Sequence, residues 1–249
     1  MIDTPTTERA LPHPRPIRRH VSYAAVGLIV ALASAIGFGP TYYLKAFFDA
    51  PPLTSLVHVH AVVMTGWLAL FISQSWLISA DRLDLHRRLG IAGGVLAMLV
   101  LGVGYQTAIA AARHGFMVRG GFPYGPLGFL AISLADLVVF GALVGAAIYY
   151  RWSDSDTHKR LMLLATVSLL APGMSRMPIS VGPIPAAAFG GLATIVIPII
   201  CAWIDRRGRG RLHPAYLWGG LFLILSEPAR LAIASLPAWQ RFAGWLIGA

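Results

Sequence analysis

The sequence predicts an all-α integral membrane protein with seven transmembrane helices. Of its 249 residues, 57% are hydrophobic and only 12% are charged, whereas an ordinary soluble domain carries about 25% charged residues. The hydrophobic residues form runs of roughly 20, the length of helix that crosses the hydrocarbon core of a bilayer. Most of the cations fall in the short segments that would lie on one side of the membrane. These three observations place the chain in a bilayer.

Seven apolar runs are candidate spans. They cover about residues 21–44, 53–79, 91–112, 126–150, 161–181, 184–204 and 215–235. The sixth run follows Pro183 and contains Pro185 and Pro198. Membrane helices tolerate proline when neighbouring helices satisfy the freed carbonyl groups. Six spans therefore remain an alternative to seven.

The two ends of the chain have different characters. Residues 1–20 are rich in proline, polar groups and cations, and the next apolar run is too long for a secretory signal, so we expect a cytoplasmic tail. Residues 236–249 contain Trp239 and Trp245 and are expected to lie along the interface as an amphipathic segment. The single cysteine, Cys201, excludes a disulfide framework and a thiolate metal cluster.

The distribution of cations predicts the orientation, because Lys and Arg collect in cytoplasmic loops. With the N-terminus inside, fourteen of the twenty cations lie on the inner side. They are Arg9, Arg15, Arg18, Arg19, Arg82, Arg87, Arg88, Arg151, Lys159, Arg160, Arg206, Arg207, Arg209 and Arg211. With seven spans the C-terminus is then on the outer side, and we expect the protein in a bacterial inner membrane. Anionic lipid headgroups account for the net charge of +10, and nucleic-acid binding need not be invoked.

A D-x-H-[K/R]-R-L pattern occurs twice, at residues 84–89 and 156–161. Each copy is expected on a cytoplasmic loop directly before a span, which predicts a duplicated helical hairpin formed by spans two and three and by spans four and five. One interpretation is a capping device, with the aspartate on helix amides and the cations on headgroup phosphates. In the other, His86 and His158 face one another and hold a b-type haem or a transition metal.

The second span carries a polar and aromatic face. His60, Met64, Trp67, Phe71 and Gln74 recur at steps of three and four, so they share one side of a helix that we expect to face the bundle. The side is either a packed stripe with one hydrogen-bonded histidine or part of a cofactor site. In the second case His60 and Gln74 would contact the cofactor.

Further ionisable and polar residues are expected in the outer half of the membrane. They are His58, His60, Tyr105, Gln106, Asp136, Arg176, Glu227 and Arg230. One interpretation is a salt-bridge network that locks the bundle, in which Arg176 pairs with Asp136 or Glu227. The other is a polar, outward-facing cavity lined by Tyr105, Gln106, Asp136, Arg176, Glu227 and Arg230. A metal there would use His58, His60, Asp136 and Glu227, although two histidines two residues apart cannot both point at one ion.

The pattern H-x-x-x-M-x-x-W-L-x-L-F-x-x-Q from His60 to Gln74, followed by LHRRLG and HKRLM, resembles a family of uncharacterised bacterial multi-pass membrane proteins. That family is distantly similar to cytochrome b561-type bundles. The resemblance covers spans two to five and implies a haem-binding helical core, with His60, His86 and His158 at the matching positions. The chain departs from a two-haem pattern, because it lacks paired histidines in both leaflets.

Several functions are excluded by missing motifs: the chain has no P-loop, no H-E-x-x-H and no C-x-x-C-H. The first hypothesis is a redox protein that binds a b-type haem or a metal ion through histidines, with a quinone or another membrane subunit as partner. The second is a small transporter or ligand-binding protein with a polar outward-facing cavity. The third is a structural subunit of a membrane complex. The sequence names no reaction.

Overall fold

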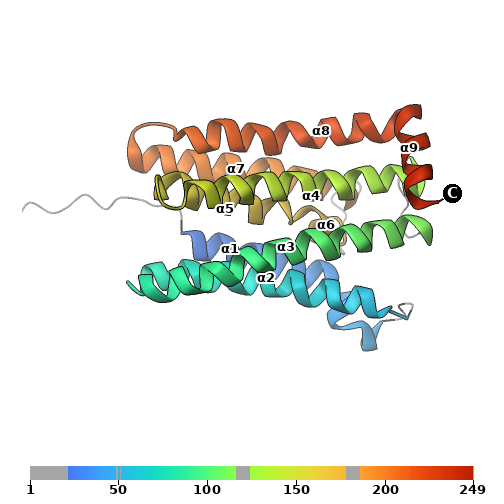
Figure 1. The fold of residues 1–249 in the computed structure, drawn as a ribbon, viewed down its shortest axis with the longest axis horizontal. Coiled ribbons are helices and arrows are strands. Elements are labelled where there is room, and N and C mark those ends of the chain that lie inside the picture. The colour runs from blue at the N-terminus through green and yellow to red at the C-terminus, as the bar shows by residue number, and fades with distance from the viewer. Residues whose placement is uncertain (1–21, 49, 51, 116–123, 178–185, 249) are drawn as a thin grey trace, which may run out of the picture.

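The computed structural model describes residues 22–48, 50, 52–115, 124–177 and 186–248, and every secondary-structure element among them is helical. The long helices run side by side and form a bundle, and a short C-terminal helix crosses one end of it (Figure 1). This confirms the predicted all-α class. The expected N-terminal tail, 1–20, lies outside the described residues.

The elements follow one another in the order shown in Figure 1. They are α1 (Tyr23–Phe38), the π-helical turn η1 (Gly39–Tyr43), the 3-10 turn η2 (Lys45–Phe47), α2 (Ser55–Ser79), α3 (Leu83–Arg113), α4 (Gly125–Tyr150), α5 (Ser155–Ser168), α6 (Ala171–Met174), α7 (Ala186–Arg209), the π-helical turn η3 (Tyr216–Gly220), α8 (Leu221–Ser235) and α9 (Pro237–Ile247).

Six helical segments of the described chain are long and apolar enough to cross a bilayer. They are Tyr23–Tyr43, Ser55–Ser79, Leu83–Arg113, Gly125–Tyr150, Ala188–Arg209 and Tyr216–Ser235, which correspond to the predicted spans one to four, six and seven. Pro198 lies inside α7 without ending it, so the run that proline made doubtful is one of the six. The chain is thus a multi-pass membrane protein by the length and composition of its helices.

The fifth predicted span, 161–181, is not among these six segments. Its described part, 161–177, contains most of α5 and all of α6, two short helices separated by Leu169 and Leu170. Arg160 near the start of α5 pairs with Asp205 near the end of α7, and Ala171 in α6 contacts Gly190 near the start of α7. The broken segment therefore runs along α7 in the opposite direction.

Helix α5 lies in the interior of the bundle. Nine of its fourteen residues are buried, and they include the polar residues Thr157, Thr166 and Ser168. A helix enclosed by other helices needs no apolar face toward lipid, because its polar groups can bond within the protein. This explains why α5 is less hydrophobic than a lipid-exposed span.

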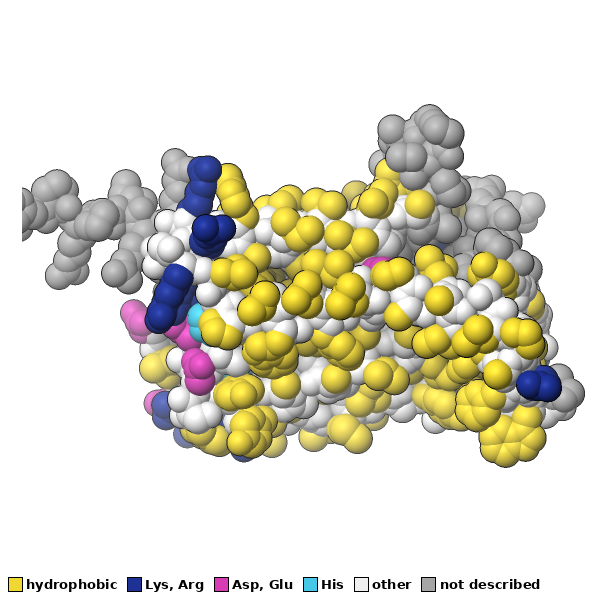
Figure 2. Space-filling view, turned by 90° about the horizontal axis from the view of Figure 1, so that it is seen from above, with side chains coloured by type: hydrophobic (Ala, Val, Ile, Leu, Met, Phe, Trp, Pro, Cys, Tyr) yellow, Lys and Arg dark blue, Asp and Glu magenta, His cyan; other side chains and the backbone are white. Residues whose placement is uncertain are grey.

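The surface of the bundle suits a hydrocarbon solvent. Figure 2 shows apolar side chains along the whole visible face, while Lys and Arg gather at one end. Val62, Met98 and Val138 are each about two-thirds exposed although they lie in the middle of long helices. In water such a surface would drive aggregation, but in a bilayer it is the expected exterior.

The two copies of the repeated motif lie inside helices and not on the loops before them. Helix α3 begins at Leu83 and α5 at Ser155, so both copies form the first turns of their helices. The predicted capping role is wrong for both aspartates: the N-cap residues are Arg82, which makes no side-chain cap, and Asp154, which accepts the Thr157 amide. Asp84 and Asp156 occupy the first turn, where the helix dipole favours a negative charge.

The two motif copies also differ in their surroundings. Arg88 in the first copy is exposed, whereas the equivalent Arg160 is only 2% exposed and enclosed by protein. The same residue type at the same motif position is therefore on the surface in one helix and in the bundle interior in the other. The predicted duplication of a helical hairpin stays a prediction.

Glycines set the closest contact between helices, where α6 meets α1 and α7. A Cβ atom on Gly37 of α1 would lie 1.9 Å from the Gly173 carbonyl oxygen, and one on Gly190 of α7 would lie 2.6 Å from the Ala171 carbonyl oxygen. Small residues allow membrane helices to approach this closely. Helix α6 is therefore fixed from two sides by backbone contacts.

We predict that Gly37→Ala destabilises the bundle by about 1–3 kcal/mol, because the new methyl group overlaps backbone that cannot move freely. Thermal unfolding of the purified protein in detergent measures the effect. Gly94→Ala in α3 is the matched control, since a Cβ atom there meets no atom within 4 Å. Equal unfolding temperatures for the two variants would contradict the prediction.

Candidate functional site

An ion cluster in the interior joins α4, α7 and α8. Arg230 of α8 pairs with Asp136 of α4, and its Nη2 lies 3.1 Å from Oε1 of Glu227 on the same helix. Arg230 and Asp136 are 2% and 8% exposed. Asp136 is eleven residues from the start of α4, about 17 Å along the helix, which is near the middle of a bilayer.

Hydroxyl groups complete the ion cluster. The Thr194 hydroxyl of α7 donates to Oε1 of Glu227 over 2.5 Å, and Arg230 donates from Nη2 to the Ser226 hydroxyl over 3.0 Å. Gly191 of α7 leaves space for Glu227, because a Cβ atom there would lie 3.2 Å from Oε2. The cluster thus contains two carboxylates and one guanidinium, all tied to neighbouring helices.

A second buried pair joins α5 to α7. Arg160 donates from Nη2 to Oδ1 of Asp205 over 2.5 Å and from Nε to Oδ2 over 3.1 Å, and both side chains are almost fully buried. This two-point geometry is the strongest arrangement of a guanidinium and a carboxylate. The predicted contact of Arg160 with lipid phosphates is therefore wrong, because its partner is inside the bundle.

The end of the bundle that carries this pair holds a second, exposed set of ion pairs. Asp156 pairs with Lys159 and with Arg209, whose Nη1 lies 2.6 Å from Oδ2. Lys159 and Arg209 hold the pKa of the Asp156 carboxyl below its usual value of 3.8. The contact ties the start of α5 to the end of α7.

His86 and His158, the histidines of the repeated motif, lie close enough for their charges to interact. Nδ1 of His158 is 2.8 Å from the Ala147 carbonyl oxygen, and Nδ1 of His86 is buried without a hydrogen-bond partner among the described residues. Gln74 donates its amide to the His86 carbonyl oxygen over 3.1 Å. His86 and Gln74 thus meet near the cation-rich end, while the predicted pairing of His86 with His158 stays a prediction.

The predicted face of α2 does point into the bundle. Trp67 is 2% exposed and contacts Phe140 of α4 edge-on, with ring centroids 4.9 Å apart. Three polar atoms on this face, Nδ1 of His60, Nε1 of Trp67 and Oε1 of Gln74, are buried without a hydrogen-bond partner among the described residues. Because unsatisfied buried polar atoms cost about 1–3 kcal/mol each, they mark places where a ligand or water is needed.

The remaining predicted residues do not share one cavity. His58 is exposed and lies 3.3 Å from the Tyr42 hydroxyl, whereas Asp136 and Glu227 belong to the Arg230 cluster. His60 lies 14 residues, about 21 Å, before Gln74 on α2. Among the described His, Cys, Asp and Glu, no group of three is placed to hold a metal ion.

Tyr105 and Gln106 are exposed and line a hollow of about 450 Å³ between α2, α3 and α9. The other lining residues are Leu56, Ile109, Ala110, Arg113, His114 and Leu246. Helix α9 closes one side of this hollow: Arg113 donates to the Ile247 carbonyl oxygen and Trp239 to that of Leu127. The hollow contains none of the charges of the ion cluster.

Arg176 is separate from both places. Its Nη1 donates to the Pro172 carbonyl oxygen over 2.7 Å, and its guanidinium lies 4.9 Å from the centroid of the Phe38 ring. The expected ion pair with Asp136 or Glu227 is not formed, because both carboxylates are taken by Arg230 and Thr194.

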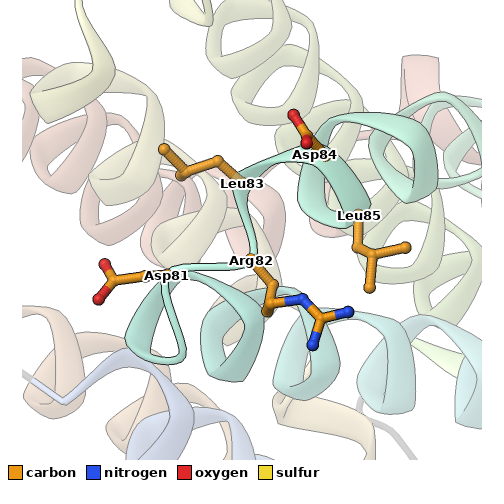
Figure 3. A pocket seen from close by; sticks show the side chains of 5 residues that line it. All are labelled: Asp81, Arg82, Leu83, Asp84 and Leu85. Atoms are coloured by element: carbon orange, nitrogen blue, oxygen red, sulfur yellow. The ribbon is translucent and has the colours of Figure 1, made fainter.

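A smaller hollow of about 230 Å³ lies at the turn between α2 and α3. Figure 3 shows that its lining consists of five consecutive residues, Asp81 to Leu85, whose side chains point in different directions. Asp81 has a positive φ of 54°, which belongs to the tight turn. Side chains that diverge do not converge on a ligand, so this hollow is a surface feature of the turn.

Sequence reasoning missed Asp205, the partner of Arg160, and Thr194, which contacts Glu227. Asp205 stands beside a run of arginines at the end of an apolar stretch, so it reads as part of a solvated helix end. The signal that could have identified Asp205 is a lone carboxylate within about one helical turn of the hydrocarbon, where an unpaired charge is unfavourable.

The fold and the paired interior charges define a multi-pass helical membrane protein whose ionisable groups lie between the helices. The chain is 37% identical over 95 residues to solute carrier family 22 member 7 of Bos taurus, an alignment that covers 34% of this chain and 17% of that protein. No protein-family model and no solved structure matches the chain.

We predict that Arg160→Gln destabilises the protein by about 3–5 kcal/mol, because it leaves Asp205 buried without its partner. Arg88→Gln, at the equivalent position of the other motif copy, is the matched control and should change stability by less than about 0.5 kcal/mol, since Arg88 is exposed. Thermal unfolding in detergent compares the two. A similar loss in both variants would show that the motif acts through its sequence and not through burial.

Proposed function

We propose that the chain is a small membrane transporter in which the Asp136–Arg230–Glu227 cluster carries the coupling charge. The observation that supports this most is the imbalance of the cluster: two carboxylates share one guanidinium inside the bundle. With all three groups ionised the cluster has one negative charge in excess. In a low-dielectric interior that excess favours uptake of one proton or one monovalent cation.

The cluster is suited to transport because its residues come from three different helices. Asp136 belongs to α4, Thr194 to α7 and Arg230 to α8, so a change of charge alters contacts between three helices at once. In transporters, sites that couple an ion to movement lie near the middle of the membrane and between packed helices. The ion pairs around Arg160 have no such excess of carboxylates, because Asp205 and Asp156 are matched by Arg160, Lys159 and Arg209.

The membrane topology belongs to the same proposal. We take the broken segment α5–α6 as a seventh, central crossing, because it runs along the full length of α7. The end rich in Lys and Arg faces the cytoplasm of a bacterial cell by the positive-inside rule. The N-terminus is then inside, and α9 lies at the outer interface, where the aromatic residues Trp239 and Trp245 are favourable.

The partial similarity to a solute carrier is consistent with transport. It covers about a third of this chain, so it supports transport as the class of function and does not indicate a substrate.

We predict that Asp136→Asn abolishes coupled charge movement while the protein still folds, because Arg230 keeps Glu227 as partner and the cluster becomes neutral. The full chain is reconstituted in proteoliposomes, and currents are recorded on solid-supported membranes after concentration jumps of small carboxylates, amino acids and sugars. We expect at least one solute class to give a current that falls at least 10-fold in Asp136→Asn.

Asp84→Asn is the matched control, since this carboxylate is exposed in the first turn of α3. It should keep the current of the parent protein. If no solute moves charge, or if Asp136→Asn transports as well as the parent, the cluster is a structural lock.

A second candidate function, electron transfer through a haem, is favoured by one observation. The contact of Nδ1 of His158 with the Ala147 carbonyl leaves Nε2 of that ring without a hydrogen bond to the described residues, which is the usual arrangement of a metal-bound histidine. His86 and His158 would hold the iron of a haem, and a haem held there would carry one electron. His60 cannot join them, because it lies about 21 Å from Gln74 along α2.

If the pair binds haem, protein purified from cells supplied with a haem precursor has a Soret absorption band that is lost in His158→Ala. His114→Ala, an exposed histidine at the opposite end of α3, should keep the band. Colourless parent protein that incorporates no haem on titration would exclude this second function.

A further inference from the structure

Arg176 is partly buried, and it differs from the buried Arg160 and Arg230 because no carboxylate of the described residues pairs with it. Arg160 and Arg230 each form ion pairs, but Arg176 forms none with the carboxylates of the described residues. Within the described part of the chain, its guanidinium contacts the Pro172 carbonyl oxygen and the face of Phe38. A guanidinium inside a membrane protein without an anion is unfavourable, so such residues usually serve a ligand.

The position of Arg176 is well fixed. It follows α6, which is held on one side by Gly37 and on the other by Gly190, both in backbone contact. The bond from Nη1 to the Pro172 carbonyl oxygen then fixes the guanidinium over Phe38. The side chain cannot turn away to the headgroups as a flexible surface arginine does.

Two donor atoms of the Arg176 guanidinium have no hydrogen-bond partner among the described residues. Nη1 is engaged, while Nε and Nη2, which form one edge of the planar group, have no hydrogen bond to the described residues. Two parallel N–H groups on one edge match the two oxygens of a carboxylate. Tyr42 and Tyr43, four and five residues after Phe38, bond the side chains of His58 and Thr65 on α2, so His60 lies on the part of α2 that contacts the segment after Phe38. Its Nδ1 is buried without a partner among the described residues.

We propose that Arg176 and His60 form a binding site for the carboxylate of a small monocarboxylate ligand, with Phe38 as an apolar wall. The single positive charge selects a single negative charge, and His60 supplies a third hydrogen bond. His60 lies five residues into α2, about 8 Å from the helix start, so the site is near the end opposite the cation-rich end. Only the role of this ligand as a transported substrate rests on the proposed function.

Binding is measured on the full chain in detergent, without transport, so the site and the proposed function fail separately. Thermal unfolding is followed by tryptophan fluorescence in sodium butyrate, with sodium chloride at equal concentration as reference. A ligand that binds the folded state raises the midpoint with its concentration. We expect a saturable rise with butyrate beyond that with chloride, and binding at least 10-fold weaker in Arg176→Gln and in His60→Phe.

Arg176→Gln also distinguishes a binding role from a structural one. Since it removes an uncompensated charge, its midpoint without butyrate should equal or exceed that of the parent. Arg113→Gln, an exposed arginine at the end of α3, should keep the butyrate response. A lower midpoint in Arg176→Gln with an unchanged butyrate response would overturn the proposal, because Arg176 would then only pack on Phe38.

Two further results would overturn it. Chloride and butyrate could raise the unfolding midpoint of the parent equally, measured against a sodium sulfate reference. That result would mean that the site does not distinguish a carboxylate from chloride. A butyrate response that appears only in Asp49→Asn, a position outside the described residues, would mean that the chain supplies the carboxylate itself.

Discussion

Hydrocarbon cannot solvate charge, and this constraint decides how the helices of the bundle meet. Arg160 needs Asp205 and Arg230 needs Asp136, so α5 is held against α7 and α8 against α4. An alternative packing would leave an ion in a low-dielectric interior, at a cost of several kcal/mol. The apolar side chains fill the space between helices, but they are too alike to select neighbours, whereas the ion pairs are specific.

The balance of each charged group separates structure from function. Arg160 bonds Asp205 at two points, which suits a permanent lock, and its Nη1 also lies 3.4 Å from Oδ1 of Asp156. The Asp136–Arg230–Glu227 cluster has one negative charge in excess, and Arg176 has no carboxylate partner among the described residues. Under our proposals the first imbalance takes up a proton or a monovalent cation, and the second binds the carboxylate of a ligand.

The two copies of the repeated motif each place a histidine near the start of a helix. His86 and His158 both lie in the first turns of their helices, α3 and α5, and no contact between the two rings is formed among the hydrogen bonds of the described residues. The motif copies are nevertheless unequal, since Arg160 is enclosed and Arg88 is exposed. A short repeated pattern can therefore place two histidines near the starts of helices without giving the two copies the same structural role.

The amino-acid sequence by itself determined the helical class, the membrane environment and six of the spans, because helix length and hydropathy are local properties. It also determined the inward face of α2, since a period of three and four residues is fixed by helix geometry. Tertiary structure alone decided that α5 is a buried, broken helix and that Asp205 is the partner of Arg160. It also divided the polar residues of the outer half among three places, because the neighbour of a charged side chain depends on contacts between distant segments that no local pattern encodes.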